Sequence, residues 1–184
     1  MKGFEDHKNS ENKIKIDSNI ENKKKQIINK AIQLHLKGNI SEAIKYYQHI
    51  INKGCNDHRV FLNYGVILKN YGKLKEAELS YRKAIEINPH YALAYSNLGS
   101  ILKDLGKLKE AEFVTRKAIE IKPDIAEAYS NLGNILKNLG KLKEAELSLC
   151  KAIEIKPYLA SAYFSLSTLK YSKKSKTYTS KHWY

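Results

Sequence analysis

The sequence repeats itself with a period of 34 residues. The stretch AYSNLGSILKDLGKLKEAE begins at Ala94, and the nearly identical AYSNLGNILKNLGKLKEAE begins at Ala128. Internal repeats of this length are typical of solenoids, in which each unit packs on its neighbours. Equivalent positions are numbered here as places 1 to 34 of a unit. The same frame runs without a gap through four units: 24–57, 58–91, 92–125 and 126–159.

Apolar spacing within a unit predicts two helices. In the first half of the third unit, apolar residues stand at Ala94, Tyr95, Leu98, Ile101, Leu102 and Leu105. Separations of three and four residues indicate a helix with one buried face. A second helix is predicted from Leu108, Ala111, Ala118, Ile119 and Ile121.

Gly and Pro mark the expected helix ends. Glycine stands at place 15 of every unit, where a left-handed residue ends a helix at low energetic cost. All three prolines stand at place 32, and proline cannot continue a helix interior. The glycines are Gly38, Gly72, Gly106 and Gly140, and the prolines are Pro89, Pro123 and Pro157.

Place 8 is small in every unit. It is Ala31, Gly65, Gly99 or Gly133, and Ser167 in a partial fifth unit. Glycine inside a helix costs about 1 kcal/mol relative to alanine, so its recurrence predicts a close approach between the two helices of a unit. Alanine at place 20 is the expected facing residue: Ala43, Ala77, Ala111 and Ala145. A Gly99→Leu substitution should then cost roughly 1–3 kcal/mol.

These residues resemble the tetratricopeptide repeat family. The third unit has Tyr95, Leu98, Gly99, Leu102, Ala111, Ala118 and Pro123 at the usual places of its signature, with Tyr where Trp is frequent. The first unit departs from the pattern, because Ile27, Lys30 and Cys55 replace the aromatic residue, the Leu and the Pro. The resemblance implies an all-α, right-handed α-solenoid of helix-turn-helix units, and it leaves the function open because such repeats serve many partners.

In this family the first helices line a concave groove, which directs attention to places 6, 9 and 13. The candidate groove residues are Asn29, Asn63, Asn97 and Asn131 at place 6, Ser100 and Asn134 at place 9, and Asn70, Asp104 and Asn138 at place 13. A primary amide offers a donor and an acceptor and can pair with the backbone of an extended peptide. The repeat arrays of O-linked N-acetylglucosamine transferases are similar, with Asn at the corresponding place. The alternative is that these amides solvate or connect adjacent helices.

Lysines form a second predicted row at place 12, with Lys69, Lys103 and Lys137. They would attract an acidic partner, or they are simply solvated helix surface. Place 5 bears Ile28, Leu62, Ser96 and Ser130. Because none of these is Lys, the clamp that chaperone-type repeats use for a terminal carboxylate is not expected.

The net charge of +14 raises the alternative of a nucleic-acid-binding protein, whose affinity would fall steeply with salt. Residues 24–159 carry 23 Lys and Arg against 14 Asp and Glu, and residues 160–184 carry five Lys and no acidic residue. The abundance of Lys, Asn and Ile equally fits the composition of an AT-rich genome. We consider nucleic acid the less favoured partner.

The sequence has no recognisable catalytic, cofactor or metal motif, so we expect a non-enzyme without cofactors. The six His show no HxxxH or HExxH spacing, and the GKLKE turns lack a phosphate-loop context. Cys55 and Cys150 lie far apart and are expected to be reduced thiols. No apolar run approaches the roughly 20 residues of a membrane span, so a cytoplasmic location without membrane insertion is expected.

The two ends differ from the repeats. Residues 1–23 are expected to be a polar, partly disordered leader, and residues 173–184 a disordered tail of Lys and aromatic residues. Residues 160–172 are expected to cap the solenoid with Tyr163, Leu166 and Leu169 facing inward. The early break of this fifth unit leaves open a transferase module, of glycosyltransferase or sulfotransferase type, that lacks its catalytic domain. Self-association through an exposed end of the stack is also open.

The leading hypothesis is a non-catalytic adaptor that binds an extended segment of another protein along the first helices. A truncated transferase module and a basic nucleic-acid-associated protein are the alternatives.

Overall fold

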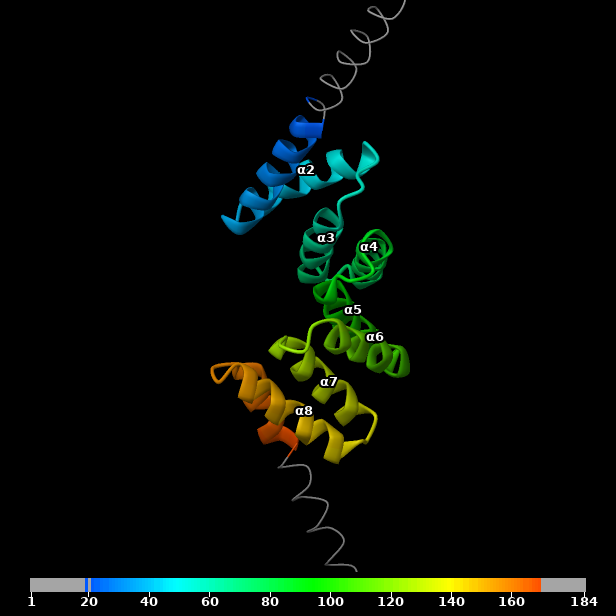
Figure 1. Ribbon diagram of the computed structural model, residues 1–184, viewed down its shortest axis with the longest axis vertical. Helices are drawn as coiled ribbons and strands as arrows, with labels where there is room; N and C mark the ends of the chain where they lie inside the picture. The colour runs from blue at the N-terminus through cyan, green and yellow to red at the C-terminus, as the bar shows by residue number, and fades with distance from the viewer. Residues whose placement is uncertain (1–18, 20, 170–184) are drawn as a thin grey trace, which may run out of the picture.

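The computed structural model describes residue 19 and residues 21–169, and all regular structure in that part of the chain is helical. A helix over residues 21–36 comes first and a helix over residues 160–169 comes last (Figure 1). Between them lie α2 Ile40–Asn52, α3 His58–Asn70, α4 Leu74–Ile87, α5 Ala92–Asp104, α6 Leu108–Ile121, α7 Ala126–Asn138 and α8 Leu142–Ile155. The predicted all-α solenoid is confirmed.

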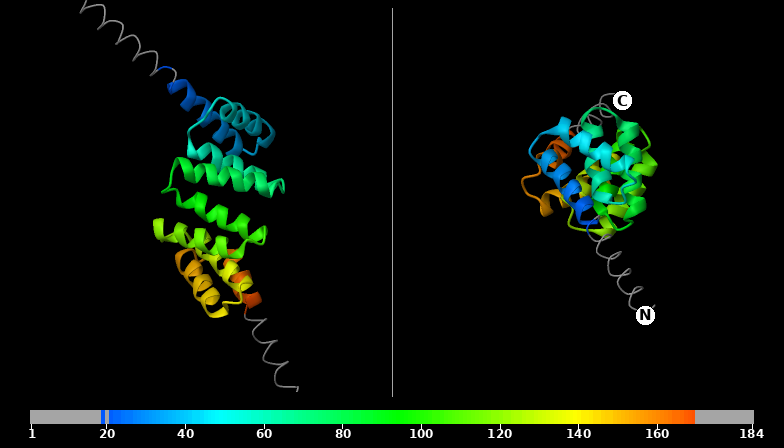
Figure 2. Two further views of the ribbon diagram at one scale, coloured as in Figure 1. Left: turned by 90° about the vertical axis from the view of Figure 1, so that its right-hand side faces the viewer. Right: turned by 90° about the horizontal axis from the view of Figure 1, so that it is seen from above.

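Each of the last three full units forms a hairpin of two packed helices. The pairs are α3 with α4, α5 with α6, and α7 with α8. The hairpins follow one another along the long axis of the molecule, as both side views show (Figures 1 and 2). The first helices also contact one another in sequence, α3 with α5 and α5 with α7.

Glycine ends each first helix in the way the sequence predicts. At Gly106, φ is +77°, and the equivalent glycines have φ between +72° and +80°. The backbone N–H of Lys107 donates to the carbonyl oxygen of Leu102 at 2.8 Å, which satisfies an acceptor at the helix end. The chain thus reverses within three residues and brings the second helix back along the first.

The small residue at place 8 allows the two helices of a hairpin to approach closely. A Cβ atom at Gly99 would lie 1.9 Å from Thr115 Oγ1 and 3.4 Å from the carbonyl oxygen of Ala111. The predicted alanine at place 20 therefore contributes its backbone, while the side chain at place 24 is the nearest neighbour. Thr115 Oγ1 is also buried without a hydrogen-bond partner among the described residues, as are the hydroxyl oxygens of Tyr47 and Tyr81 at the same place.

The linkers after α4, α6 and α8 close the joint to the next unit. Each helix ends two residues before its proline, and place 31 has extended or near-extended backbone with φ between −134° and −142°. The apolar residue at place 34 then packs into the joint. Ile125 is 6% exposed and contacts a cluster that includes Ala92, Ala118 and Ala128.

The last described helix packs on α8 only through part of its predicted inner face. Leu169 is fully buried and Leu166 is half-buried. Tyr163 was predicted to face inward, but it is 49% exposed, and Phe164 is 71% exposed. The prediction that Tyr163 faces inward is therefore wrong for the part of the chain that the structure describes. The predicted tail and most of the predicted leader lie outside the described residues.

Within the described part of the chain, no helix combines the length and the apolar character that crossing a membrane requires.

Candidate functional site

The place 6 asparagines, which we call the amide row, lie on successive first helices. Asn63 on α3, Asn97 on α5 and Asn131 on α7 are half-buried, whereas Asn29 on the helix over residues 21–36 is exposed. Because α3 contacts α5 and α5 contacts α7, the three half-buried amides belong to one continuous face.

The three half-buried amides make different hydrogen bonds. Asn63 Nδ2 donates to the carbonyl oxygen of Arg59 in its own helix at 2.9 Å. Asn131 Nδ2 donates to the carbonyl oxygen and to Oγ of Ser96 in the previous unit, both at 3.3 Å. Asn97 makes no side-chain hydrogen bond to a residue in the described ranges. Asn131 therefore connects neighbouring units. The side chain of Asn97 keeps all its donors and its acceptor available to a partner.

The residues predicted at places 9 and 13 also differ from one another in exposure and in hydrogen bonding. Ser100 is 8% exposed, so a partner has little access to it. Asn134 is half-buried and donates to the carbonyl oxygen of Ser130 at 3.1 Å. The place 13 residues Asn70, Asp104 and Asn138 are exposed at the ends of the first helices.

The lysine row at place 12 bridges the units. Lys69 Nζ donates to Ser100 Oγ at 2.9 Å, and Lys137 Nζ donates to Thr168 Oγ1 at 3.1 Å. In both pairs the acceptor is a neutral hydroxyl in the next unit, so the ammonium group keeps its positive charge. Lys103 forms an ion pair with Asp104 instead. Two of the three predicted lysines thus present a fixed, uncompensated charge.

The second helices carry an ion-pair ladder that sequence reasoning missed. Arg82 of α4 bonds to Glu78 at 2.8 Å and to Glu110 of α6 at 2.6 Å, while Lys107 bonds to Glu78 at 2.9 Å. The next joint repeats this arrangement with Glu112, Arg116, Lys141 and Glu144. The recurrence of Glu at place 21 and Arg at place 25 was a visible signal. The partners that lie 28 and 29 residues later could be assigned only from the fold.

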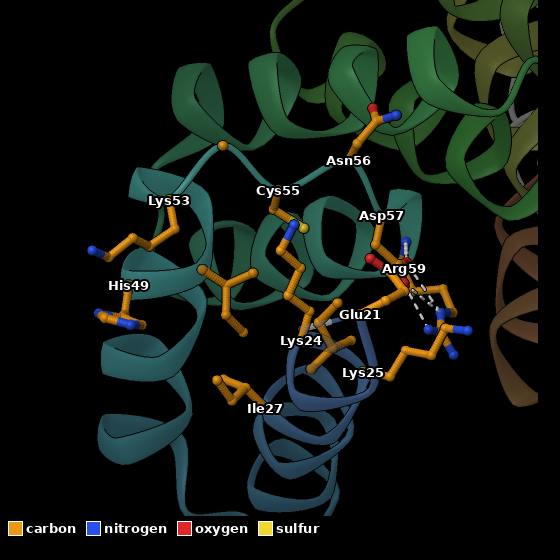
Figure 3. A pocket seen from close by; sticks show the side chains of 13 residues that line it. Glu21, Lys24, Lys25, Ile27, His49, Lys53, Cys55, Asn56, Asp57 and Arg59 are labelled. Atoms are coloured by element: carbon orange, nitrogen blue, oxygen red, sulfur yellow. Dashed lines mark hydrogen bonds and ion pairs between the residues drawn. The ribbon is translucent and has the colours of Figure 1, made fainter. Parts of the chain in front are cut away.

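A cavity of about 500 Å³ lies at the end of the first unit, beside the start of the second. Its walls come from the helix over residues 21–36, the end of α2, the linker that follows it and the start of α3 (Figure 3). None of the twelve predicted groove residues lines it. The sequence shows that this unit departs from the repeat pattern, but it does not predict an opening.

On one side of the cavity, the charged side chains of Asp57 and Arg59 are paired with each other. The guanidinium of Arg59 donates to both carboxylate oxygens of Asp57, at 3.0 Å from Nε to Oδ1 and 2.6 Å from Nη2 to Oδ2. Burial alone would raise the pKa of Asp57, but these hydrogen bonds outweigh it and hold that pKa below its ordinary value. Burial raises the pKa of the Cys55 thiol, so this cysteine is mainly protonated at neutral pH.

Comparison with known sequences identifies the repeats. A family model described as TPR repeat matches residues 65–106 and 99–140, and one described as tetratricopeptide repeat matches residues 126–158. Together they extend over half of the chain, from the first helix of the second unit to the end of the fourth. No curated protein sequence matches the chain significantly.

Solved structures share the fold. The chain is 26% identical to MamA, with a TM-score of 0.68 over 78% of this chain and 84% of that one. The first TPR of Spaghetti (RPAP3), bound to the HSP90 peptide SRMEEVD, is 24% identical, with a TM-score of 0.61 over 64% and 94%. YrrB, described as a TPR protein with an unusual peptide-binding site, is 23% identical, with a TM-score of 0.66 over 80% and 76%.

Proposed function

This chain belongs to the tetratricopeptide repeat family, and we propose that it is a non-catalytic scaffold that holds an extended segment of another protein along α3, α5 and α7. The amide row supplies the main contacts. A cytoplasmic location, expected from the sequence, is part of the same proposal.

The bonding capacity of the amide row is the observation that carries this proposal. Asn97 offers two N–H donors and one carbonyl acceptor, and none of these is used by another described residue. Asn63 and Asn131 donate through Nδ2, which leaves each Oδ1 as an acceptor. Donors and acceptors that repeat along one face match the alternating N–H and C=O groups of an extended backbone. Such contacts grip a peptide largely independently of its side chains.

The lysine row favours an acidic segment. Lys69 and Lys137 are each held by a neutral hydroxyl, so their orientation is fixed while their charge stays available to a carboxylate. Lys103 contributes less because Asp104 already neutralises it. Acidic side chains of the bound segment are therefore expected beside Lys69 and Lys137, at the two ends of the lysine row.

The structural comparisons support a protein or peptide as the partner. The RPAP3 domain is seen with a bound peptide, and YrrB is described by its peptide-binding site. The resemblance of the amide row to the Asn-bearing face of O-linked N-acetylglucosamine transferase repeats supports the same backbone-gripping role. It does not bring the enzyme's chemistry to this chain.

The test is a pull-down from native lysate, with and without nuclease, that compares the parent chain with Asn97→Ala. Because the Asn97 side chain makes no hydrogen bond within the described structure, its loss should leave the melting temperature nearly unchanged. Recovery of nuclease-resistant protein partners should fall about 5- to 10-fold, as expected for one or two lost hydrogen bonds. Asn52→Ala, an exposed amide at the end of α2, is the matched control and should change neither quantity.

Two outcomes would contradict the proposal. Protein partners that survive both nuclease and the Asn97→Ala change would place binding on another face. Recovery that disappears with nuclease would favour the nucleic-acid alternative and make the lysines the functional surface.

A further inference from the structure

The linker beside the cavity at the first joint differs from the later linkers. Gly54 occupies place 31 with φ of +75°, where the later units have extended or near-extended backbone. Cys55 replaces the proline, and Asp57 replaces the apolar residue of place 34. The apolar side chain of place 34 is therefore missing here, and α2 packs less extensively on α3 than α4 packs on α5.

The inner wall of the cavity is apolar. Ile28 and Ile50 line it and are 7% and 8% exposed, so they present aliphatic surface that belongs to the core of the first unit. Ile27 is 37% exposed at the same wall. A volume of about 500 Å³ lies within the range of small-molecule sites, which are concave and largely apolar with a few polar groups.

The rim of the cavity is cationic. Lys24, Lys25 and Lys53 line it together with His49, and all four side chains belong to exposed residues. Figure 3 shows Lys24 beside Cys55, with Lys25 on the side of the Asp57–Arg59 pair and Lys53 with His49 on the other side. The lining carboxylates among the described residues are Glu21 and Asp57, and Asp57 is already paired.

The charge of the repeats is concentrated around this joint. Residues 24–91 carry 12 Lys and Arg against 5 Asp and Glu, whereas residues 92–159 carry 11 against 9. An anionic ligand would thus be attracted to the first two units more strongly than to the last two. The backbone N–H of Arg59 at the start of α3 is not available to it, because Asp57 Oδ1 accepts from this group at 2.9 Å.

We propose that this cavity binds a small amphipathic carboxylate, with its aliphatic chain against the isoleucine wall and its carboxylate between the rim lysines. The apolar wall selects the chain, and the lysines select the negative charge. This site is separate from the amide row, so it is independent of the proposed scaffold function.

Cys55 provides a reporter inside the cavity, and Cys150 provides its control. Cys55 is half-buried and lines the cavity, whereas Cys150 is exposed on α8 in the fourth unit. Both are free thiols. A ligand in the cavity should slow alkylation of Cys55 without affecting Cys150.

The experiment measures alkylation of the two cysteines by N-ethylmaleimide in the full chain, using mass spectrometry, with dodecanoate as the probe below its micelle concentration. At ten times its dissociation constant, dodecanoate should slow Cys55 alkylation about tenfold and leave Cys150 unchanged. Dodecanol, which has the same chain without the charge, should protect much less. The Lys24→Glu/Lys25→Glu variant should lose the protection, while Lys45→Glu, an exposed lysine of α2 outside the cavity, should keep it.

Several results would overturn this proposal. These are no protection of Cys55, equal protection by dodecanol, equal protection of both cysteines, or unchanged protection in the Lys24→Glu/Lys25→Glu variant. Circular dichroism of each variant confirms that it is folded. Asn97→Ala should retain full protection, so failure of the groove proposal and failure of this one are distinguishable.

Discussion

The first joint of this solenoid and the later joints are built from different chemistry. At the later joints an apolar residue at place 34 fills the contact, and the ion-pair ladder connects consecutive second helices. At the first joint Ile44 and Gln48 stand where Glu and Arg build the ladder, and Asp57 stands where Ile125 packs. Asp57 instead caps α3, which is the only helix among α2 to α8 with a side-chain cap.

This difference shows how few residues change the chemistry of a joint in a repeat stack. Both kinds of joint connect helices of similar length with the same glycine turn inside each unit. At the first joint a polar cap stands in place of the ladder and the apolar residue, and a cavity of about 500 Å³ lies beside it. A more open hollow of about 400 Å³ lies between α6, α7 and α8, where the ladder is present. We infer that units 58–159 act as one stable body and that the first unit is joined to it less firmly.

The largest expected effect comes from place 8 in the closed part of the stack. Gly99→Leu should lower the free energy of unfolding by about 3 kcal/mol, because even a Cβ atom would lie 1.9 Å from Thr115 Oγ1. The first unit already carries Ala31 at this place, so it tolerates a Cβ that the third unit does not. Urea denaturation followed by circular dichroism measures the difference.

Combining Thr115→Ala with Gly99→Ala tests whether the Thr115 hydroxyl is what requires glycine at place 8. Thr115→Ala removes the hydroxyl that obstructs the new atom, so it should recover part of the stability lost in Gly99→Ala. If Gly99→Leu melts like the parent, the close approach of α5 and α6 is not what requires glycine.

The ion-pair ladder is expected to contribute less. Glu112 is hydrogen-bonded by Lys141 and Arg116, and its side chain is 15% exposed. Glu112→Gln should lower the free energy of unfolding by about 1–2 kcal/mol because it weakens two charge-assisted contacts. Glu42→Gln, an exposed acid of α2 in the first unit, should change it by less than about 0.5 kcal/mol. Equal effects would show that the ladder does not distinguish the joints.

The same ladder predicts a loss of stability in acid. The hydrogen bond from Lys141 is the main cause that holds the pKa of Glu112 below 4.5, and for Glu78 bonds from Lys107 and Arg82 outweigh the opposing effect of burial. Because the folded pKa lies below the unfolded one, this stabilisation is complete above about pH 4.5 and disappears as the pH falls through the folded value. Denaturation midpoints measured between pH 6 and 3 should therefore fall less steeply in Glu112→Gln than in the parent.

At the first joint, the interaction to remove is the Asp57 cap of α3. Asp57→Ala should cost about 1 kcal/mol, since the carboxylate accepts from the N–H of Arg59 and pairs with its guanidinium. Asp124→Ala is the control at a closed joint, where the exposed carboxylate lies 3.8 Å from Lys122, and its effect should be near zero. Chemical denaturation of both variants tests this, and a larger loss at Asp124 would reverse the assignment.

The smallest expected effect is a gain in stability. Thr115→Val replaces a buried hydroxyl that lacks a hydrogen-bond partner by a methyl group of similar size, and should raise the free energy of unfolding by about 0.5–1 kcal/mol. Thr168→Val should act in the opposite direction, because that hydroxyl accepts from Lys137 and donates to the carbonyl oxygen of Ser165. A destabilised Thr115→Val variant would mean that the hydroxyl is satisfied in solution.

The fold followed from the sequence because its signals are local and repeated. Gly106 and Pro123 mark the ends of the two helices of one unit, and apolar spacing marks their buried faces. The structure confirms these predictions through the left-handed glycines and the helices that end before each proline.

The site was less predictable because it depends on contacts between units. The sequence placed Asn97 and Asn131 in equivalent positions, yet Asn131 bonds to Ser96 of the previous unit while Asn97 does not. The bond between Lys69 and Ser100 and the ladder from Arg82 to Glu110 join residues 28 to 31 positions apart. Their partners depend on how one hairpin is rotated on the next, which the helical period alone does not specify.

Native-state hydrogen exchange measured by mass spectrometry tests the difference between the joints most directly. Local opening is easiest where few buried contacts close a joint. The account predicts that amides in residues 21–52 exchange well before those in α4 to α7, which should exchange together late in the time course. Equal protection across all the described helices would contradict it, because the first unit would then be as firmly joined as the rest.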